Sequence, residues 1–208
     1  MTGQNETGPG GAAIAAAIAA AAFFAQRGWA PATSGNFSVR TGTGRMAITA
    51  SGRDKGALTA ADFIAVDIGG ILPPGVSAEA PLHAALYARD PAVGAVFHVH
   101  SPAATLASQS RLAAGQVAFE GYEMLKALAG VMTHETRVTL PVFANDQDIP
   151  ALAARLMPAL AEGPGQVGYL LAGHGLYAWG RDPAEARRHV EAIDFLLMCE
   201  LEKERLAR

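Results

Sequence analysis

Residues 92–100 read Ala-Val-Gly-Ala-Val-Phe-His-Val-His, a compact apolar run that ends in two histidines one residue apart. The run from Ala92 to His98 is short and almost wholly apolar, which predicts a strand buried on both faces. Side chains two residues apart on a strand project to the same face, so His98 and His100 can reach one cation. A His-x-His pair alone more often binds nothing. Its position at the end of a buried strand favours a metal site, because unliganded histidines are costly to bury.

Short helices and strands alternate around this run. We expect helices over 12–25, 79–89, 101–108, 121–129, 147–161 and 183–205, and further strands over 37–40, 46–49, 63–67, 138–143, 167–171 and 176–179. The strands at 37–40 and 46–49 form a hairpin, Ser77 is the expected cap of the helix at 79–89, and Pro183 beside Asp182 opens the last helix. Interleaved strands and helices predict a single α/β domain over 12–208, with helices on both faces of a sheet. Residues 1–11 are expected to form a flexible tail.

The composition excludes several classes of protein. Of the 208 residues, 50% are hydrophobic and 17% are charged, so there is enough apolar surface to order the chain. A net charge of −3 offers no basic excess for a nucleic acid. The uncharged run Ala12–Ala25 is shorter than the roughly 20 residues that span a bilayer, and no Lys or Arg precedes it as in a signal peptide. We therefore expect a cytoplasmic protein with no membrane or nucleic-acid partner.

Six histidines stand beside a single cysteine, so a metal would be held by imidazole and carboxylate. His174 lies between two glycines, which allow a sharp turn and a close approach to neighbouring backbone. With His98 and His100 it would make a three-histidine site with an open position, the arrangement of catalytic zinc sites. Three histidines remain. We expect His83 to be a structural residue or to orient the metal ligands, His134 to face substrate, and His189 to lie on the surface.

Two acids and two loops are further candidates. Glu79 opens the helix before the His-x-His strand, and Glu123 lies in the segment Gly-Tyr-Glu-Met; either is suited to proton transfer beside a metal-bound carbonyl compound. A glutamate at a helix start more often only compensates the helix dipole. The turns at 33–36 and 51–53 combine hydroxyls with glycine and are suited to an anion, although such turns are often no more than turns. Neither matches a nucleotide-binding fingerprint.

Taken together and in order, several stretches resemble the class II aldolase and adducin head family. They are TSGNFSVR at 33–40, TASGRDKG at 49–56, EAPLHAALY at 79–87, HVHS at 98–101 and GHGLYAWG at 173–180. The resemblance implies a three-layer α/β/α fold around a central, mostly antiparallel sheet, in a homo-oligomer, typically a tetramer with sites at subunit interfaces. It also implies one divalent metal per subunit, usually zinc, on His98, His100 and His174, and a phosphate site in the two loops, at Ser34, Gly35, Asn36, Ser51 and Gly52.

Within this family the segments 119–130 and 133–149 resemble dehydratases more than aldolases. That likeness implies a lyase that removes water from a small phosphorylated keto-sugar in methionine salvage. The resemblance implies that the dehydratases use the glutamate aligned with Glu123 as acid/base, whereas the aldolases use the glutamate aligned with Glu79. We favour Glu123 for the chemistry and Glu79 as an auxiliary carboxylate near the metal, with Arg53 and His134 as substrate contacts. The alternatives are a sugar-phosphate aldolase or epimerase, or a non-catalytic binding module like the adducin head.

Overall fold

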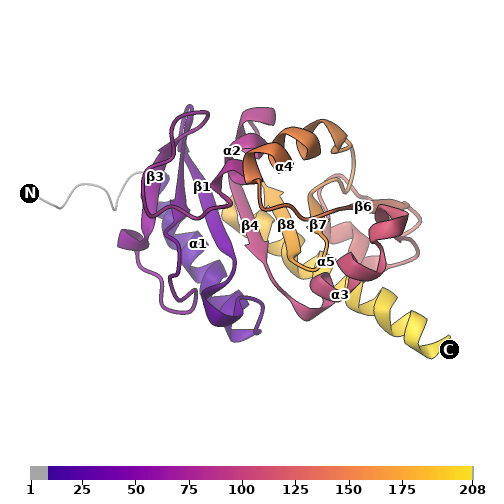
Figure 1. Cartoon of the computed structure of the whole chain (residues 1–208). Coiled ribbons are helices and arrows are strands. Elements are labelled where there is room, and N and C mark those ends of the chain that lie inside the picture. Colours follow the sequence, from indigo (N-terminus) through magenta and orange to yellow (C-terminus); the bar gives the residue numbers. More distant parts are fainter. Residues whose placement is uncertain (1–8, 208) are drawn as a thin grey trace, which may run out of the picture.

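A single eight-stranded sheet runs through the computed structural model, which describes residues 9–207 (Figure 1). The strand order is β3-β2-β1-β4-β8-β7-β6-β5, and among the described pairs only β6 and β7 run parallel. The strands are β1 (Asn36–Gly42), β2 (Arg45–Thr49), β3 (Phe63–Asp67), β4 (Ala95–Val99), β5 (Gln116–Phe119), β6 (Val138–Phe143), β7 (Gly168–Leu171) and β8 (Gly175–Gly180). The prediction of a mostly antiparallel sheet is confirmed.

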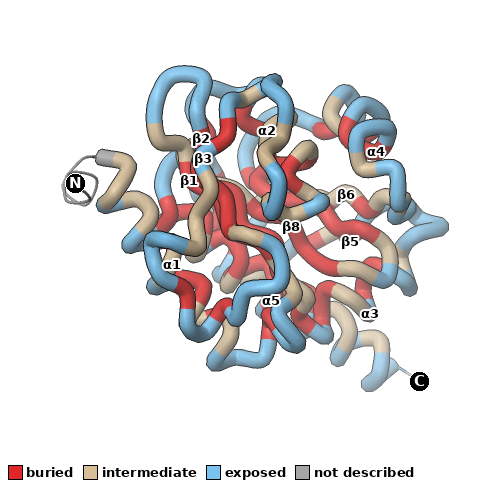
Figure 2. The backbone as a smooth tube through the Cα atoms, turned by 60° about the vertical axis from the view of Figure 1, so that its left-hand side comes forward, coloured by how far each residue is buried: buried red, intermediate tan, exposed pale blue. Residues whose placement is uncertain are grey.

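Helices cover both faces of the sheet. One face carries α1 (Pro9–Gln26), α3 (Pro102–Ser110) and α5 (Pro183–Leu206), and the other carries α2 (Ala80–Arg89) and α4 (Ile149–Leu156). Each face has its own apolar core: Phe24 of α1 and Leu196 of α5 belong to the first, and Leu86 of α2 and Leu152 of α4 to the second. Figure 2 shows the strands buried between helices whose outer surfaces are exposed. The predicted three-layer α/β/α fold is therefore confirmed.

Strand β4 lies at the centre of this arrangement, and all five of its residues are buried. Its side chains alternate between the two cores, with Phe97 in the core under α1 and α5 and Val96 in the core under α2 and α4. Antiparallel pairing on both sides places His98 opposite Asn36 of β1 and Tyr177 of β8. The register thus gathers three polar side chains from distant parts of the chain at one end of the strand.

Several helices begin or end at residues other than the predicted ones. Helix α1 begins at Pro9, so residues 9–11 of the predicted tail are helical; the rest of that tail, residues 1–8, lies outside the described residues. The helix expected at 121–129 is a 3₁₀ segment, Glu123–Ala127. The one expected at 147–161 is α4 followed by a 3₁₀ turn, Met157–Ala159, where Pro158 removes a backbone donor.

Two further local features differ from expectation. Ser77 does not cap α2: the cap position is Glu79, and the Ser77 hydroxyl instead accepts the Glu79 backbone N–H at 3.3 Å. Strand β5 is absent from the sequence prediction, because its four residues have no clear alternation of their own and pair only with the longer β6. None of the helices within residues 9–207 combines the length and the apolar character that crossing a lipid bilayer requires.

The prediction that His189 lies on the surface is wrong. Its side chain is fully buried on the inner face of α5, where Nδ1 donates to the Trp179 carbonyl oxygen at 2.6 Å and Nε2 accepts the Ala129 backbone N–H at 3.1 Å. Burial lowers the pKa of this imidazole, so it is neutral in the folded chain. His189 therefore links α5 to β8 and to the loop before β6.

Replacing this histidine should destabilise the fold in a pH-dependent way. We expect His189→Ala to lower the free energy of unfolding of the metal-free protein at pH 7.5 by about 2–3 kcal/mol, from a lost buried side chain and an unpaired backbone N–H. The difference in free energy of unfolding between wild type and His189→Ala should be smaller at pH 5. Below about pH 6.5 the unfolded wild type binds a proton on His189, whereas burial disfavours the protonated imidazole in the folded state. Urea unfolding at both pH values measures this. His134→Ala, at a half-exposed histidine, is the control and should stay within about 0.5 kcal/mol at both; an equal, pH-independent loss in the two variants contradicts the assignment.

Candidate metal centre and active site

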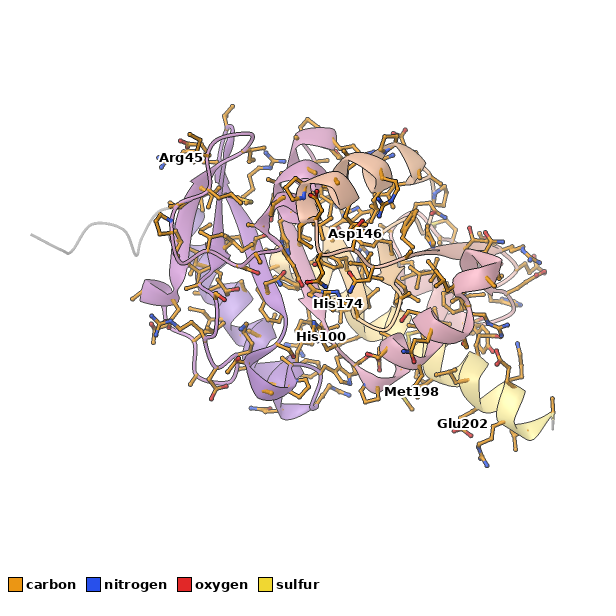
Figure 3. The ribbon with its side chains drawn as sticks, viewed as in Figure 1. Arg45, His100, Asp146, His174, Met198 and Glu202 are labelled. Atoms are coloured by element: carbon orange, nitrogen blue, oxygen red, sulfur yellow. The ribbon has the colours of Figure 1, made fainter. Side chains whose placement is uncertain are left out.

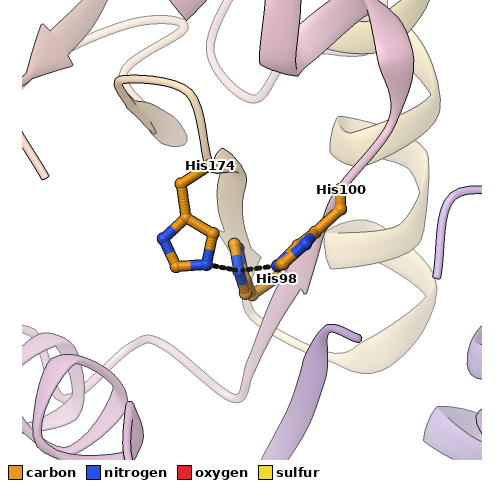
Figure 4. Close-up of side chains that lie close together, drawn as sticks. All are labelled: His98, His100 and His174. Atoms are coloured by element: carbon orange, nitrogen blue, oxygen red, sulfur yellow. Dashed lines mark hydrogen bonds between the residues drawn. The ribbon is translucent and has the colours of Figure 1, made fainter. Parts of the chain in front are cut away.

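Three imidazoles converge at the end of β4 (Figures 3 and 4). The Nε2 atom of His98 lies 2.8 Å from Nε2 of His100 and 3.2 Å from Nε2 of His174. His98 is supplied by β4 itself, His100 by the residue just after the strand, and His174 by the turn between β7 and β8. His98 is buried and the other two are half-buried. The structure thus brings the three predicted ligands together at one point.

The protonation of His98 favours metal binding. Its Nδ1 donates to the Leu176 carbonyl oxygen at 3.0 Å, which leaves the Nε2 lone pair directed at the other two rings. Burial lowers the pKa of His98 well below its usual value, and burial together with His174 lowers the pKa of His100 to about 4. The Nε2 atoms of His100 and His174 both lie within hydrogen-bond distance of the His98 Nε2 atom. Three imidazole nitrogens at this spacing are suited to a divalent metal ion.

Glu79 completes the cluster on one side. Its carboxylate lies 3.4 Å from Nε2 of His98 and 3.1 Å from Nε2 of His174. Ligand atoms at about 2.0–2.1 Å from a tetrahedral zinc ion lie roughly 3.3 Å from one another, so the spacing of the three imidazole nitrogens is compatible with one ion, and the Glu79 carboxylate lies beside them. Tyr177 donates to Glu79 Oε2 at 2.7 Å and Asn36 Nδ2 donates to the same oxygen at 2.6 Å. Burial acts to raise the pKa of Glu79, but His98, His174 and the hydrogen bonds outweigh it and hold the pKa well below its usual range.

Two glycines allow the surrounding backbone to reach β4. A Cβ on Gly175 would overlap the Val99 carbonyl oxygen, and a Cβ on Gly35 would lie 2.7 Å from the His98 carbonyl oxygen. Gly35 also has a φ of +77°, a conformation that side chains disfavour. Gly35 was predicted to bind phosphate; its position shows that it also lets the 33–36 loop pack against the strand that carries the histidines.

The two predicted phosphate loops are joined by a buried lysine. Lys55 is 2% exposed, and its Nζ donates to the Thr33 carbonyl oxygen at 2.8 Å and to the Arg53 carbonyl oxygen at 2.7 Å. Within residues 9–207 its ammonium has no ion-pair partner. Burial lowers the pKa of Lys55 and outweighs the opposing effect of the nearby Asp54 carboxylate. Beside it, the buried Ser34 hydroxyl oxygen has no hydrogen-bond partner among the described residues. This combination of a cation and an unused donor is suited to an anion.

The other predicted loop residues are more exposed. Ser51 and Gly52 lie in the exposed turn after β2, where the Ser51 backbone N–H donates to the Gly75 carbonyl oxygen and Gly52 has a φ of +71°. Arg53, predicted to contact substrate, pairs with Asp62 at 3.2 Å. The side chain of Asn36 is not free toward the loop, since its amide lies between Glu79 and His83.

Glu123 and His134 form a separate group. The Glu123 carboxylate is 69% exposed and lies 2.6 Å from Nζ of Lys126 and 3.1 Å from Nδ1 of His134. Hydrogen bonding to Lys126 lowers the pKa of Glu123, so it is ionised at neutral pH. None of its ion-pair contacts within the described chain is to the histidine cluster. The two candidate glutamates thus occupy different places in one subunit.

Sequence reasoning missed Tyr177 and Lys55. Tyr177 stacks on the His98 ring with centroids 4.0 Å apart, but only the pairing of β4 with β8 brings the two together. Lys55 carries a weak signal in the sequence, as a lysine in the glycine-rich segment that follows a candidate anion loop.

Comparison with known proteins settles the family. A model described as the Class II Aldolase and Adducin N-terminal domain matches residues 15–201. This chain belongs to that family. Two class II aldolase relatives are named methylthioribulose-1-phosphate dehydratase. The protein of Xanthomonas campestris pv. campestris (strain 8004) is 54% identical over 181 residues, which is 86% of this chain and 83% of that protein. The one of Methylococcus capsulatus is 52% identical over 185 residues, 88% of this chain and 90% of that protein.

A solved class II aldolase structure has the same fold. The l-fuculose-1-phosphate aldolase from Thermus thermophilus superposes with a TM-score of 0.76 at 28% identity, covering 93% of this chain and 94% of that one.

The histidine cluster should control metal content. We expect the purified protein, loaded with Zn²⁺ and dialysed, to hold about one ion per chain, and His98→Ala and His174→Ala to hold less than about a tenth of that. Mass spectrometry of the metal measures both. His134→Ala removes a histidine outside the cluster and should keep the full content. Equal metal content in all three variants would rule out this cluster as the site.

Proposed function

We propose that the protein is a hydro-lyase that dehydrates 5-methylthioribulose 1-phosphate to 5-methylthio-2,3-dioxopentyl 1-phosphate, a reaction of methionine salvage in the cytoplasm. The observation that carries the proposal is the identity of more than half of the aligned residues with relatives named methylthioribulose-1-phosphate dehydratase. The convergent imidazoles with Glu79 beside them supply the chemical setting that such a reaction needs.

We propose His98, His100 and His174 as the ligands of one divalent ion per subunit, most simply Zn²⁺. When bound, such an ion polarises the substrate carbonyl and lowers the pKa of the adjacent C–H group. The Leu176 carbonyl keeps His98 in the tautomer that can bind a cation. Glu79 is ionised and accepts hydrogen bonds from Tyr177 and Asn36. Its negative charge beside the ion would reduce the net positive charge of the site.

The dehydration requires a base at C3 and an acid at the C4 hydroxyl. We propose that Glu123 takes the C3 proton and returns it to the departing hydroxyl, so that water leaves and the resulting enol tautomerises to the diketone. Its ionised state is that of a base, and His134 at 3.1 Å is placed to adjust its proton affinity. Because Glu123 has no contact with the histidine cluster in its own chain, this role requires a neighbouring subunit, as in a tetramer with its sites at subunit interfaces.

The phosphate end of the substrate is assigned to the 33–36 and 51–53 loops. Ser34, Gly35, Asn36, Ser51 and Gly52 are the proposed contacts, and the structure suggests Lys55 as the source of positive charge. A dianionic phosphate would compensate the buried ammonium and accept from the unpartnered Ser34 hydroxyl. Holding this end fixes the reacting carbons relative to the cluster.

An aldolase or epimerase acting on sugar phosphates is the second candidate. It is favoured by the position of Glu79, which lies in the cluster itself, where a proton-transfer group of an aldolase would act. Product analysis separates the two: a dehydratase makes a diketone from 5-methylthioribulose 1-phosphate, whereas an aldolase cleaves sugar phosphates to dihydroxyacetone phosphate and an aldehyde.

Glu123 should be essential for dehydration. We expect Glu123→Gln to lower turnover of 5-methylthioribulose 1-phosphate by more than about tenfold, while Glu120→Gln, at an exposed carboxylate nearby, stays close to wild type. The assay follows the diketone in metal-loaded enzyme, and removal of the metal by a chelator should abolish the signal. Full activity of the chelated protein, or turnover of Glu123→Gln within about tenfold of wild type, contradicts the mechanism.

The same variant tests whether the site is shared between subunits. Glu123→Gln and His174→Ala, each inactive alone, should regain part of the wild-type activity when their subunits are dissociated and reassembled together. In a mixed interface one subunit offers intact metal ligands and the other an intact Glu123. No recovery would place both groups in one subunit.

Lys55 should control phosphate affinity. We expect Lys55→Met to weaken binding of inorganic phosphate to the metal-loaded protein by about tenfold or more, because it removes a charge-assisted contact in a site with little water. Isothermal titration calorimetry measures the affinity, and Lys203→Met, at an exposed lysine of α5, is the control. Unchanged phosphate binding in Lys55→Met would leave Lys55 as a support for the two loops only.

A further inference from the structure

Behind Glu79 a chain of hydrogen bonds runs inward along β1 and α2. Asn36 Nδ2 contacts Glu79 Oε2 at 2.6 Å, and Asn36 Oδ1 contacts His83 Nε2 at 2.5 Å. His83 Nδ1 then lies 2.7 Å from the Ser38 hydroxyl oxygen, which lies 3.0 Å from the Tyr87 hydroxyl. The chain therefore joins the carboxylate of the candidate site to a tyrosine deep in the second core.

The spacing of these residues explains how the chain is built. Glu79, His83 and Tyr87 recur every four residues at the start and along one face of α2. Asn36 and Ser38 are two residues apart on β1 and so share a face of the strand. One face of a helix thus lies against one face of a strand, and their polar residues alternate along the contact.

Only one assignment of the hydrogens satisfies every member. A carboxylate only accepts, so the Asn36 amide nitrogen faces Glu79 and its oxygen accepts from His83 Nε2–H. Burial lowers the pKa of His83 to about 4, so the ring is neutral and Nδ1 accepts from the Ser38 hydroxyl. The single Ser38 hydrogen is then used, since its other acceptor, the Val96 carbonyl oxygen, is distant at 3.5 Å. Ser38 therefore accepts from Tyr87.

Every donor in this chain points toward Glu79. The inner members are almost inaccessible to solvent: Ser38 and His83 are 0% exposed, Tyr87 2% and Asn36 4%. A buried polar network of this kind gains little stability over apolar packing, but when fully satisfied it holds its members in one arrangement. The arrangement it holds here is the orientation of the Asn36 amide, and through it that of the Glu79 carboxylate.

We propose that His83 is a positioning residue for Glu79: its Nε2–H fixes the Asn36 amide, which in turn orients the Glu79 carboxylate beside the three histidines, and the Ser38 hydroxyl selects the tautomer of His83 that can do so. The effect on turnover rests on the proposed dehydratase function. The tautomer does not, and it is measurable in the protein whatever reaction it performs.

The first test reads the tautomer directly. In the metal-loaded protein labelled with ¹⁵N-histidine, we expect His83 to show a protonated Nε2 and an unprotonated Nδ1 at neutral pH. The signals are assigned by their absence from His83→Gln. A protonated Nδ1, or a mixture of the two tautomers, overturns the proposal even if the protein proves to be a dehydratase.

The second test separates positioning from general support of the fold. His83→Leu keeps an apolar side chain in the cavity but removes the donor, and we expect kcat to fall by about tenfold or more with KM within about twofold and metal content unchanged. His83→Gln places an amide donor near the Nε2 position and should recover a large part of the lost kcat. Tyr87→Phe removes only the hydrogen bond farthest from Glu79 and is the matched control, expected within about threefold of wild type.

The two tests fail in distinguishable ways. A kcat of His83→Leu within about twofold of wild type, or His83→Gln no better than His83→Leu, overturns the positioning role. If His83→Leu does not fold, the tautomer measurement decides it, because a protonated Nδ1 or a mixture of tautomers removes the Nε2–H donor to Asn36 on which the positioning role depends. If the wild-type protein has no dehydratase activity, the proposed function fails while the nuclear magnetic resonance result still tests the tautomer.

Discussion

The burial of β4 between β1 and β8 is the constraint on which the rest of the structure depends. Antiparallel pairing on both sides leaves no freedom in register, because a slip by one residue would turn Phe97 and Val99 out of their core. With the register set, His98 must lie between Asn36 and Tyr177. The imidazole cluster, the Glu79 carboxylate at the start of α2 and the hydrogen-bond chain behind it all follow from the position of that one imidazole.

Burying a polar side chain in a sheet lowers the free energy of unfolding unless the side chain is hydrogen-bonded. The hydrogen bonds found here also orient the groups of the candidate site. His98, His83 and Glu79 each have defined partners: a backbone carbonyl, a hydroxyl with an amide, and a tyrosine with an amide. Two groups at the proposed phosphate loops differ from this pattern. The Lys55 ammonium is bound only by carbonyl oxygens, and the Ser34 hydroxyl has no partner among the described residues. These are the two groups that we propose as contacts of the substrate phosphate.

Features that depend on local sequence patterns were predicted correctly, whereas features that depend on contacts between residues distant in sequence were not. Strand β4 and the His-x-His pair are local patterns, and both were predictable from about nine residues. The burial of His189 was not, because Arg188 beside it is polar and the carbonyl of Trp179 that holds it belongs to another element. Strand β5 and the 3₁₀ segment at Glu123–Ala127 likewise depend on neighbours that are distant in sequence.

The sequence by itself determined the α/β class, the family resemblance and the three histidines, because spacing along a strand and a glycine-flanked turn are properties of the chain alone. Only the tertiary structure showed which contacts bring an acid to these histidines. The residues alone left the roles of Glu79 and Glu123 open, and the family resemblance favoured Glu123 for the chemistry and Glu79 near the metal. Packing of α2 on β1 brings Glu79 to the histidines and leaves Glu123 exposed beside Lys126 and His134. The tertiary structure alone also revealed the direction of the hydrogen-bond chain through His83. The hydrogen bonds share one direction because each donor in the chain has one acceptor. The donors and acceptors alternate between α2 and β1, so neither segment alone contains the chain.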